Sequence, residues 1–397
     1  MRKTCVTYVS LCFLAACLMG SVASICAASQ PVVIGVPVPL SGQLEAFGQM
    51  MKNAFEMAVE DVNRAGDIHG RSVELRFADD RGDAARVDDA YRRMASAGAV
   101  MLVGGYASDA TYRMARMAES GDLPFLVCTA SADKITQRGW TNIYRLNPPI
   151  SEYTQGLEDF WIKNFKPKSM AILHEDSMFG TEGALRMMEF CREQAIEIIT
   201  HIGYDRVTLT PARLRSRLAP LTFEPPDVIY MISYFEDALM LVKSIKALGI
   251  DSMLCGGGGG FTLAAFAQAA GADADLLLTA ALWSDQVDTL DNGSFHKRYA
   301  QRFGHKADYH GAEAYSALMV AAEALRTAKS FAPHDIRQAL NCIYMKTPFG
   351  PVKFYSHEDF ERQNNIHTLV LQIINGRYET VWPPDKASAG FILPKRD

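Results

Sequence analysis

Short apolar runs alternate with amphipathic segments from residue 32 onward, and this alternation constrains the fold more than any other feature. Met51, Phe55 and Val62 recur at helical spacing after the first run, which predicts a helix there. Strands that alternate with helices form a parallel sheet with helices on both faces. The pattern restarts near residue 170, so we predict an α/β protein of two doubly wound parallel-sheet lobes. The runs typical of strands are 32–40, 73–77, 100–103, 124–128, 143–146, 170–174, 197–202, 228–232 and 253–255; further helices are expected at 179–195, 211–219, 235–248 and 310–328.

The two series are separated and followed by turn signals. Asn147 precedes Pro148 and Pro149, and paired prolines end a strand and stiffen the segment that leaves it. Near the C-terminus, strands are expected at 352–355 and 368–374, and the second of these is followed by Asn375-Gly376, a hairpin signal.

The N-terminus has the pattern of an export signal. Arg2 and Lys3 precede an apolar stretch over 6–19, and small residues up to Ala28 offer a cleavage point, so we expect residues 1–28 to be a signal peptide. Residues 14–17 (LAAC) also resemble a lipobox, which would leave a lipid on Cys17. No later stretch has the ~20 apolar residues that span a bilayer. The expected location is the periplasm, either free or lipid-anchored.

Composition and cysteine spacing exclude several classes of function. The formal charge of −5 and the lack of a long basic run argue against nucleic acid as a partner. Cys128, Cys191, Cys255 and Cys342 lack metal-ligand spacing, so no metal site is expected. Disulfide pairing and buried free thiols both remain open for these four cysteines.

Catalytic motifs are absent from the sequence. The glycine run at 256–260 is not followed by Lys-Ser or Lys-Thr, so it is no phosphate-binding P-loop. Neither HExxH nor GxSxG occurs. We therefore expect no enzyme activity, no catalytic residues and no cofactor.

Two neighbouring strand ends carry small hydroxyl residues. The run 100–103 leads through Gly104 and Gly105 to Ser108 at the start of a helix, and 124–128 leads to Thr129 and Ser131. Ligands of open α/β sheets bind beyond the carboxyl ends of the strands. We predict a small polar pocket for carboxylate oxygens there, against the alternative that Ser108 merely caps its helix.

An ordered set of short motifs resembles the leucine/isoleucine/valine-binding protein family, the type I periplasmic binding proteins of ABC transporters. The set spans nearly all of the chain after the export signal, in the family's order. Its members are 39–42 (PLSG), 47–48 (FG), 62–66 (VNRAG), 70 (G), 78–80 (ADD), 104–108 (GGYAS), 129–131 (TAS), 136–139 (TQRG), 144–145 (YR), 174–180 (HEDSMFG) and 349–354 (FGPVKF).

The resemblance implies an architecture and a mode of action. Two lobes joined by a multi-strand hinge would close over a small ligand and deliver it to an ABC permease, with the protein acting as a monomer. Lobe I would comprise 29–148 and 282–348, and lobe II 149–281 and 349–397. A ligand-sensing module that signals to a membrane receptor is the alternative, because the same lobes serve as sensor ectodomains.

The resemblance also implies ligand-binding residues. Ser108 and Ser131 would bind the ligand's carboxylate or amino group, with help from the backbone of Ala107 and Thr129. Three aromatic positions would line the cleft: Phe47, Phe179 and Tyr234. Trp283, which follows the expected strand 276–281, is a further candidate, with core packing as its alternative role.

One departure from the family bears on the nature of the ligand. Gly258 stands where the branched-chain binders place a glutamate for the ligand's ammonium group, and Phe47 and Phe179 replace tyrosines. An unpaired ammonium in a dry cleft costs several kcal/mol, so an amino-acid ligand would need another acid. The ligand would otherwise lack an amine. The candidate acids are Asp109, Glu175, Asp176, Glu236 and Asp285.

Overall fold

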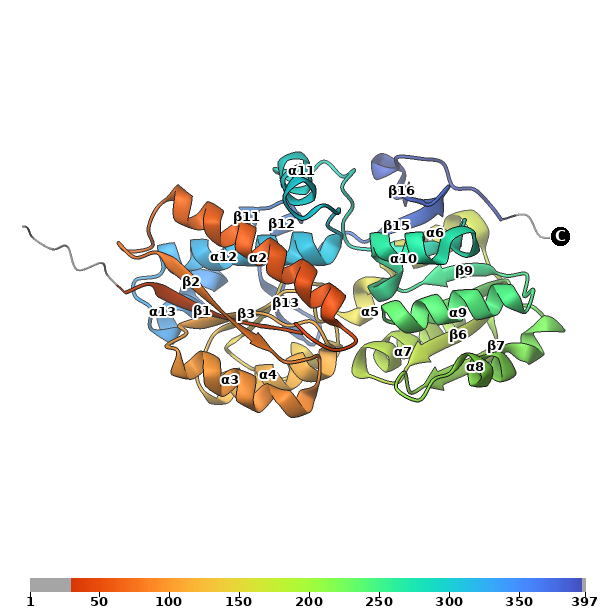
Figure 1. The fold of residues 1–397 in the computed structure, drawn as a ribbon, viewed down its shortest axis with the longest axis horizontal. Coiled ribbons are helices and arrows are strands. Elements are labelled where there is room, and N and C mark those ends of the chain that lie inside the picture. The colour runs from red at the N-terminus through yellow and green to blue at the C-terminus, as the bar shows by residue number, and fades with distance from the viewer. Residues whose placement is uncertain (1–29, 395–397) are drawn as a thin grey trace, which may run out of the picture.

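The computed structural model describes residues 30–394. The chain forms two α/β lobes that lie side by side along the long axis of the molecule (Figure 1). The predicted signal peptide 1–28 and the alternative lipid site Cys17 lie outside the described residues. Among the residues described, no helix is both long and apolar enough to span a bilayer.

The sheet of lobe I is mostly parallel and has the strand order β13-β14-β5-β4-β3-β1-β2. Helices α2 and α12 pack side by side on one face, and α3 and α4 pack together on the other (Figure 1). The strands are β1 (Val32–Val38), β2 (Val73–Asp79), β3 (Met101–Gly104), β4 (Phe125–Val127), β5 (Ile143–Arg145), β13 (Tyr355–His357) and β14 (Phe360–Gln363); the helices are α2 (Glu45–Ala65), α3 (Val87–Ser96), α4 (Ser108–Ser120), α11 (Asn292–Phe303), α12 (Tyr309–Thr327) and α13 (Pro333–Asn341).

The sheet of lobe II has the order β16-β15-β10-β9-β8-β6-β7, and only β15 and β16 run antiparallel to their neighbours. Its central strand β9 and the neighbouring β8 are buried along their whole length, which places the core of this lobe around the middle of the sheet. The strands are β6 (Ser169–Glu175), β7 (Glu197–Tyr204), β8 (Val228–Ile232), β9 (Met253–Gly256), β10 (Leu278–Ala281), β15 (Leu369–Ile374) and β16 (Arg377–Trp382); the helices are α5 (Ile150–Tyr153), α6 (Gln155–Phe160), α7 (Met178–Glu193), α8 (Pro211–Leu218), α9 (Phe235–Ala247) and α10 (Ala264–Ala270).

The predicted alternation and the two parallel sheets are confirmed, with most boundaries within two residues of expectation. The hairpin turn also forms: Asn375 and Gly376 both have positive φ, at 50° and 75°, and they join β15 to β16. Gly104 is required sterically at the end of β3, because a Cβ there would lie 2.6 Å from the carbonyl oxygen of Pro37. The segment that follows this close approach, residues 105–107, connects β3 to α4.

The chain passes between the two sheets three times: after β5, after β10 and between β14 and β15. The third passage differs from the expected boundary at residue 349, because β13 and β14 pair within the sheet of lobe I. A separate two-stranded ribbon, β11 (Met345–Lys346) with β12 (Pro351–Val352), precedes them. The polar sequence of β14 has no apolar alternation, so its place is set by tertiary contacts and not by a strand pattern.

A buried arginine makes those contacts. Arg145, at the end of β5, is fully buried and donates to Gln363 Oε1 at 2.7 Å, to the carbonyl of Ala132 at 2.6 Å and to Thr136 Oγ1 at 2.7 Å. Gln363 in turn donates to the carbonyl of Asn147 at 2.6 Å. Burial lowers the pKa of the Arg145 guanidinium to about 10, so the group stays charged at neutral pH. The network thus joins two of the three passages to the loop after β4.

We predict that Arg145→Lys lowers the free energy of unfolding by about 2–4 kcal/mol, because the single nitrogen of a lysine cannot reach acceptors that are bonded by three different guanidinium nitrogens, and buried groups are left unpaired. Urea denaturation followed by circular dichroism measures the change. The matched control is Arg302→Lys, in the exposed ion pair with Glu60, which should cost less than about 1 kcal/mol. Equal losses in the two variants would contradict the role given to Arg145.

Candidate functional site

A small cavity lies between the two lobes at the carboxyl ends of their strands. Its volume is about 20 Å³, which is room for about one water molecule. The lobes are therefore closed in this structure. Lobe I contributes Tyr106, Ser108, Thr129, Ser131, Tyr309 and His310, and lobe II contributes Tyr153, Phe179, Tyr234 and Gly259.

Ser108, Thr129 and Ser131, which were predicted from two strand ends, lie together in the cavity wall. Ser108 is the first residue of α4, and the N-cap position is held by Ala107, which has no side-chain group to cap the helix. Instead Ser108 Oγ accepts from the backbone N–H of Ala132 at 3.2 Å. The capping alternative is wrong, because this hydroxyl ties the start of α4 to the loop after β4.

The N-terminus of α4 presents backbone N–H donors at this wall. The N–H groups of Ser108, Asp109 and Ala110 have no acceptor among the described residues. The N-terminus of a helix carries unsatisfied donors and a partial positive charge, which together favour an anion. This end of the cavity is therefore equipped to bind a carboxylate.

Two other helices that begin near the cavity, α7 of lobe II and α12 of lobe I, differ from α4 because the protein's own acids accept from their N-termini. Glu175 accepts from the N–H of Gly180 at 2.9 Å, and Asp109 from the N–H of Met178 at 3.1 Å, both in α7. Asp308 accepts from the N–H of His310 at 2.9 Å in α12. Burial raises the pKa of Glu175 to about 7 even with its hydrogen bonds from Ser177. Carboxylates of the protein thus already cap α7 and α12, whereas no described side chain accepts from the first turn of α4.

Phe179 and Tyr234 line the cavity, whereas the four remaining candidates do not. Phe47 is buried behind Tyr106, with ring centroids 4.7 Å apart. Ala107 is the residue before α4 and is buried outside the cavity. Gly258 is adjacent to the lining residue Gly259.

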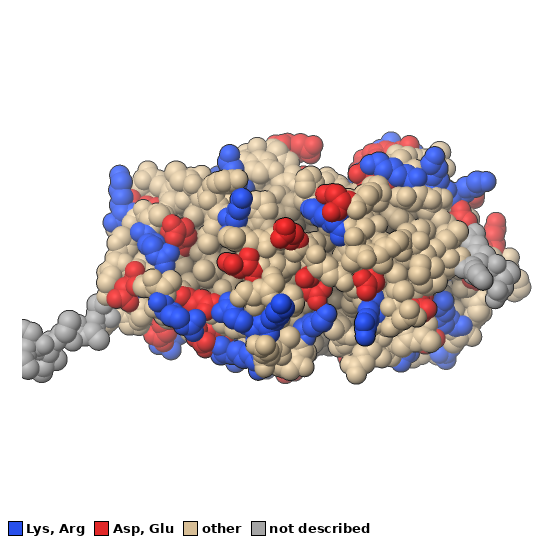
Figure 2. Space-filling view, turned by 90° about the horizontal axis from the view of Figure 1, so that it is seen from above, with Lys and Arg blue, Asp and Glu red and all other residues tan. Residues whose placement is uncertain are grey.

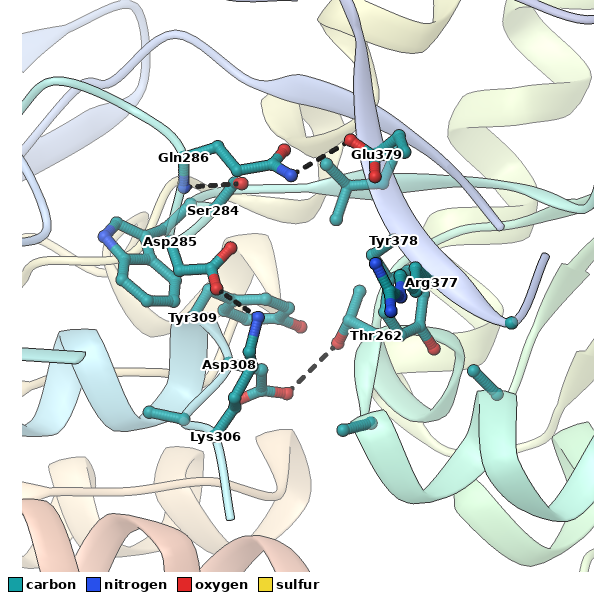
Figure 3. A pocket seen from close by; sticks show the side chains of 16 residues that line it. Thr262, Ser284, Asp285, Gln286, Lys306, Asp308, Tyr309, Arg377, Tyr378 and Glu379 are labelled. Carbon is teal, nitrogen blue, oxygen red and sulfur yellow. Dashed lines mark hydrogen bonds and ion pairs between the residues drawn. The ribbon is translucent and has the colours of Figure 1, made fainter. Parts of the chain in front are cut away.

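Trp283 lies in a neighbouring pocket of about 520 Å³ between the lobes (Figure 3). Its indole N–H donates to the carbonyl of Pro348 at 3.0 Å. The pocket is crossed by the ion pair of Lys306 with Asp285 at 2.7 Å, and by the hydrogen bond of Thr262 to Asp308 at 3.2 Å. Lys306 and Asp285 thus neutralise each other within this pocket.

Four aromatic lining residues were not found from the sequence: Tyr106, Tyr153, Tyr309 and His310. The hydroxyl of Tyr153 donates across the lobes to the Tyr309 hydroxyl at 2.5 Å, and the N–H of Gly259 also donates to that hydroxyl, at 3.1 Å. His310 stacks on Tyr309 at 3.9 Å. One sequence signal could have pointed to two of them. Asp308 is of a residue type that favours helix N-caps, and an N-cap there places Tyr309 and His310 in the first turn of the predicted helix.

Gly258 leaves no space for a side chain. Its φ is 79°, and a Cβ would lie 2.6 Å from Cε1 of Tyr153, so the Tyr153 ring fills the space. None of the five candidate acids lines the cavity. Asp109, Glu175 and Asp285 are engaged as described above, and Asp176 and Glu236 are exposed.

The surface and the cysteines indicate no further chemistry. Lysine and arginine are interspersed with acids over the face in Figure 2, in keeping with the low net charge. Cys128, Cys191 and Cys255 are buried free thiols and Cys342 is an exposed one. Within residues 30–394, no three histidine, cysteine or acidic side chains gather as a metal site would require.

Comparison with known proteins gives one family and one fold. Residues 31–376 match the periplasmic binding protein family. A Leu/Ile/Val-binding protein homolog from Brucella melitensis is 26% identical over 386 residues, which cover 93% of this chain and 95% of the relative.

Solved structures with the same fold include binding proteins for different solutes. A leucine binding protein LivK from Thermotoga maritima superposes with a TM-score of 0.80 at 18% identity, covering 88% of this chain and 97% of that one. A solute binding protein from R. palustris, in complex with benzoate, gives a TM-score of 0.79 at 18% identity, covering 92% and 98%. LivJ from Streptococcus pneumoniae, in complex with isoleucine, gives 0.78 at 20% identity, covering 89% and 100%.

The family match confirms the resemblance inferred from the sequence, and the relatives are binding proteins and not enzymes, as expected. With its two closed α/β lobes and a cavity between them, the chain belongs to the periplasmic binding protein family.

Proposed function

We propose that this protein captures a small solute bearing a carboxylate in the cleft between its lobes and delivers it to an ABC permease. The observation that carries the proposal is the free N-terminus of α4 beside the hydroxyls of Ser108, Thr129 and Ser131. Backbone N–H groups and hydroxyls that converge on one point bind a carboxylate well in a site shielded from water.

The solutes of the structural neighbours support the carboxylate. Isoleucine and benzoate, in the complexes of two of those proteins, share a carboxylate and differ in everything else. The group common to both is the one that the α4 end of this cavity is equipped to bind. The aromatic walls of the cavity would hold the remaining apolar part of such a solute.

Entry and release require the lobes to separate. Several hydrogen bonds join the lobes, among them the N–H of Asp133 to Glu182 Oε2 at 2.7 Å and the contact of Tyr153 with Tyr309. A cavity with room for about one water molecule cannot admit a solute in this state. A ligand that contacts both lobes stabilises closure in proportion to its preference for the closed form.

The proposed place of action is the periplasm, where residues 1–28 would direct export. Cleavage after Ala28 gives a free monomer, and modification of Cys17 gives a lipid-anchored one. In both forms the closed, loaded protein docks on its permease.

We predict that Ser108→Ala and Ser131→Ala each weaken binding by roughly 1.5–3 kcal/mol, because each removes a hydroxyl donor from a charged carboxylate. A thermal-shift screen of amino acids and aromatic acids supplies the ligand, and isothermal titration calorimetry measures its affinity. Ser120→Ala is the matched control, since Ser120 lies exposed at the other end of α4. Unchanged affinity in both site variants would refute the carboxylate site.

We also predict that the saturating ligand makes the protein more compact. Because the lobes separate for entry, the unliganded ensemble contains open molecules, and ligand contacts with both lobes shift it towards the closed form. Small-angle X-ray scattering should show a smaller radius of gyration with ligand. Superimposable curves with and without ligand would argue against a cycle of opening and closing.

A further inference from the structure

Glu313 is a buried acid for which the described structure provides no partner. It lies in α12, one helical turn after Tyr309, and its side chain is completely buried. Neither of its carboxyl oxygens has a hydrogen-bond partner within residues 30–394. Buried polar groups are almost always hydrogen-bonded, and an exception calls for a functional explanation.

Glu313 lies directly behind the wall of the cavity. Tyr309, Tyr153 and Thr129 all line the cavity, and each of them interacts electrostatically with the Glu313 carboxyl. Tyr309 and Glu313 share one face of α12, because residues four apart on a helix are neighbours. The Thr129 hydroxyl is close enough to favour the charged form, although it makes no hydrogen bond of ordinary geometry.

Among residues 30–394, no lysine or arginine acts on the Glu313 carboxyl. The groups that face it are Cys128 and Thr129 after β4, Tyr153 from α5, and Asp308 and Tyr309 from α12. Arg145, the buried cation nearest in the sequence to Thr129, interacts with other acids. Burial raises the pKa of the Glu313 carboxyl well above its ordinary value, which favours the neutral, protonated form while no cation lies beside it.

We propose that Glu313 is the binding partner of a protonated amine on the solute, which makes the solute a small amino acid. This inference rests on the proposed function and names its substrate class. The carboxylate would occupy the α4 end, and the ammonium group would lie towards Thr129 and Glu313. These two ends follow β3 and β4, neighbouring strands of one sheet that lie about 4.8 Å apart, a spacing that suits an α-amino acid.

Two features of the cavity support an amine at this end. The lining residues other than Gly259 are hydroxyl-bearing or aromatic, and aromatic faces attract cations. Gly258, at the position where the resemblance calls for an acid, cannot carry a side chain, because Tyr153 fills that space. When the lobes open, Tyr153 of lobe II moves away from Tyr309 of lobe I. Glu313 is then no longer shielded by lobe II.

The proposal fixes the proton balance of binding. The solute arrives with its ammonium group already protonated, and Glu313 changes from neutral to charged, so one proton passes to solvent for each solute bound. Affinity then rises with pH, and the Kd falls about tenfold per pH unit while the unliganded carboxyl is protonated. His310 lines the same cavity and is bonded to Asp308, so a variant of Glu313 is needed to show which group releases the proton.

The test compares amino acids with the same acids lacking the amine. The pairs are glycine with acetate, L-alanine with propanoate, L-valine with 3-methylbutanoate and L-leucine with 4-methylpentanoate. Calorimetry at pH 7 in two buffers of different ionisation enthalpy gives both the affinity and the number of protons released. The expected result is that an amino acid binds about 10- to 100-fold more tightly than its partner and releases close to one proton.

Glu313→Gln should lose about 10- to 100-fold in affinity for the amino acid, release no proton and bind the acid without the amine as the wild type does. Glu323→Gln is the matched control, since Glu323 lies on the same helix, half-exposed and paired with Arg326. The comparison of the pairs on the wild type needs no variant, so it stands even if Glu313→Gln folds poorly.

Equal binding within each pair, or unchanged proton release in Glu313→Gln, would overturn the role of Glu313. If benzoate or another acid without an amine then still binds and Ser108→Ala weakens it, the carboxylate site stands while the amine site falls. If no carboxylate of any kind binds, the proposed function fails with it.

Discussion

The buried guanidinium of Arg145 supports both the hinge and the cleft. Its bonds to Gln363 and Ala132 join a chain passage to the loop that carries Thr129 and Ser131. Ala132 is bonded through its N–H to Ser108, so the same loop fixes the start of α4. A charge that is fully buried among neutral acceptors is costly to remove, because each acceptor would then be left unpaired. The site is therefore positioned by the polar core of the hinge as well as by the sheets.

The fold was largely predictable, because it depends on local periodicity. Apolar runs and amphipathic helices gave both sheets, and the doublet Asn375-Gly376 gave the hairpin. The place of β14 was not predictable, since it depends on buried polar contacts of Gln363 with Arg145 and Asn147, which are distant in the sequence. Hydrophobic pattern carries no information about such a pairing.

The residues of the candidate site likewise fall into some that the sequence predicts and some that it does not. Ser108, Thr129 and Ser131 could be found because parallel strands end at one edge, a rule that needs no tertiary detail. Tyr153 of lobe II and Tyr309 of lobe I meet across the two lobes, and no local pattern indicates that contact. Glu313 falls in an ordinary amphipathic helix sequence, and only its complete burial in α12 distinguishes it from a surface acid such as Glu323.

The division of the cavity wall between the lobes has a kinetic consequence. All three small hydroxyl residues and the free end of α4 belong to lobe I, while lobe II presents Tyr153, Phe179, Tyr234 and Gly259. A half-site with its polar groups on one rigid lobe can dock a solute before the other lobe moves. Under the proposed function, capture would proceed at a rate set by encounter with the open form, and release would require the aromatic wall of lobe II to move away. The residence time of the solute, more than its rate of arrival, would be set by how firmly lobe II closes.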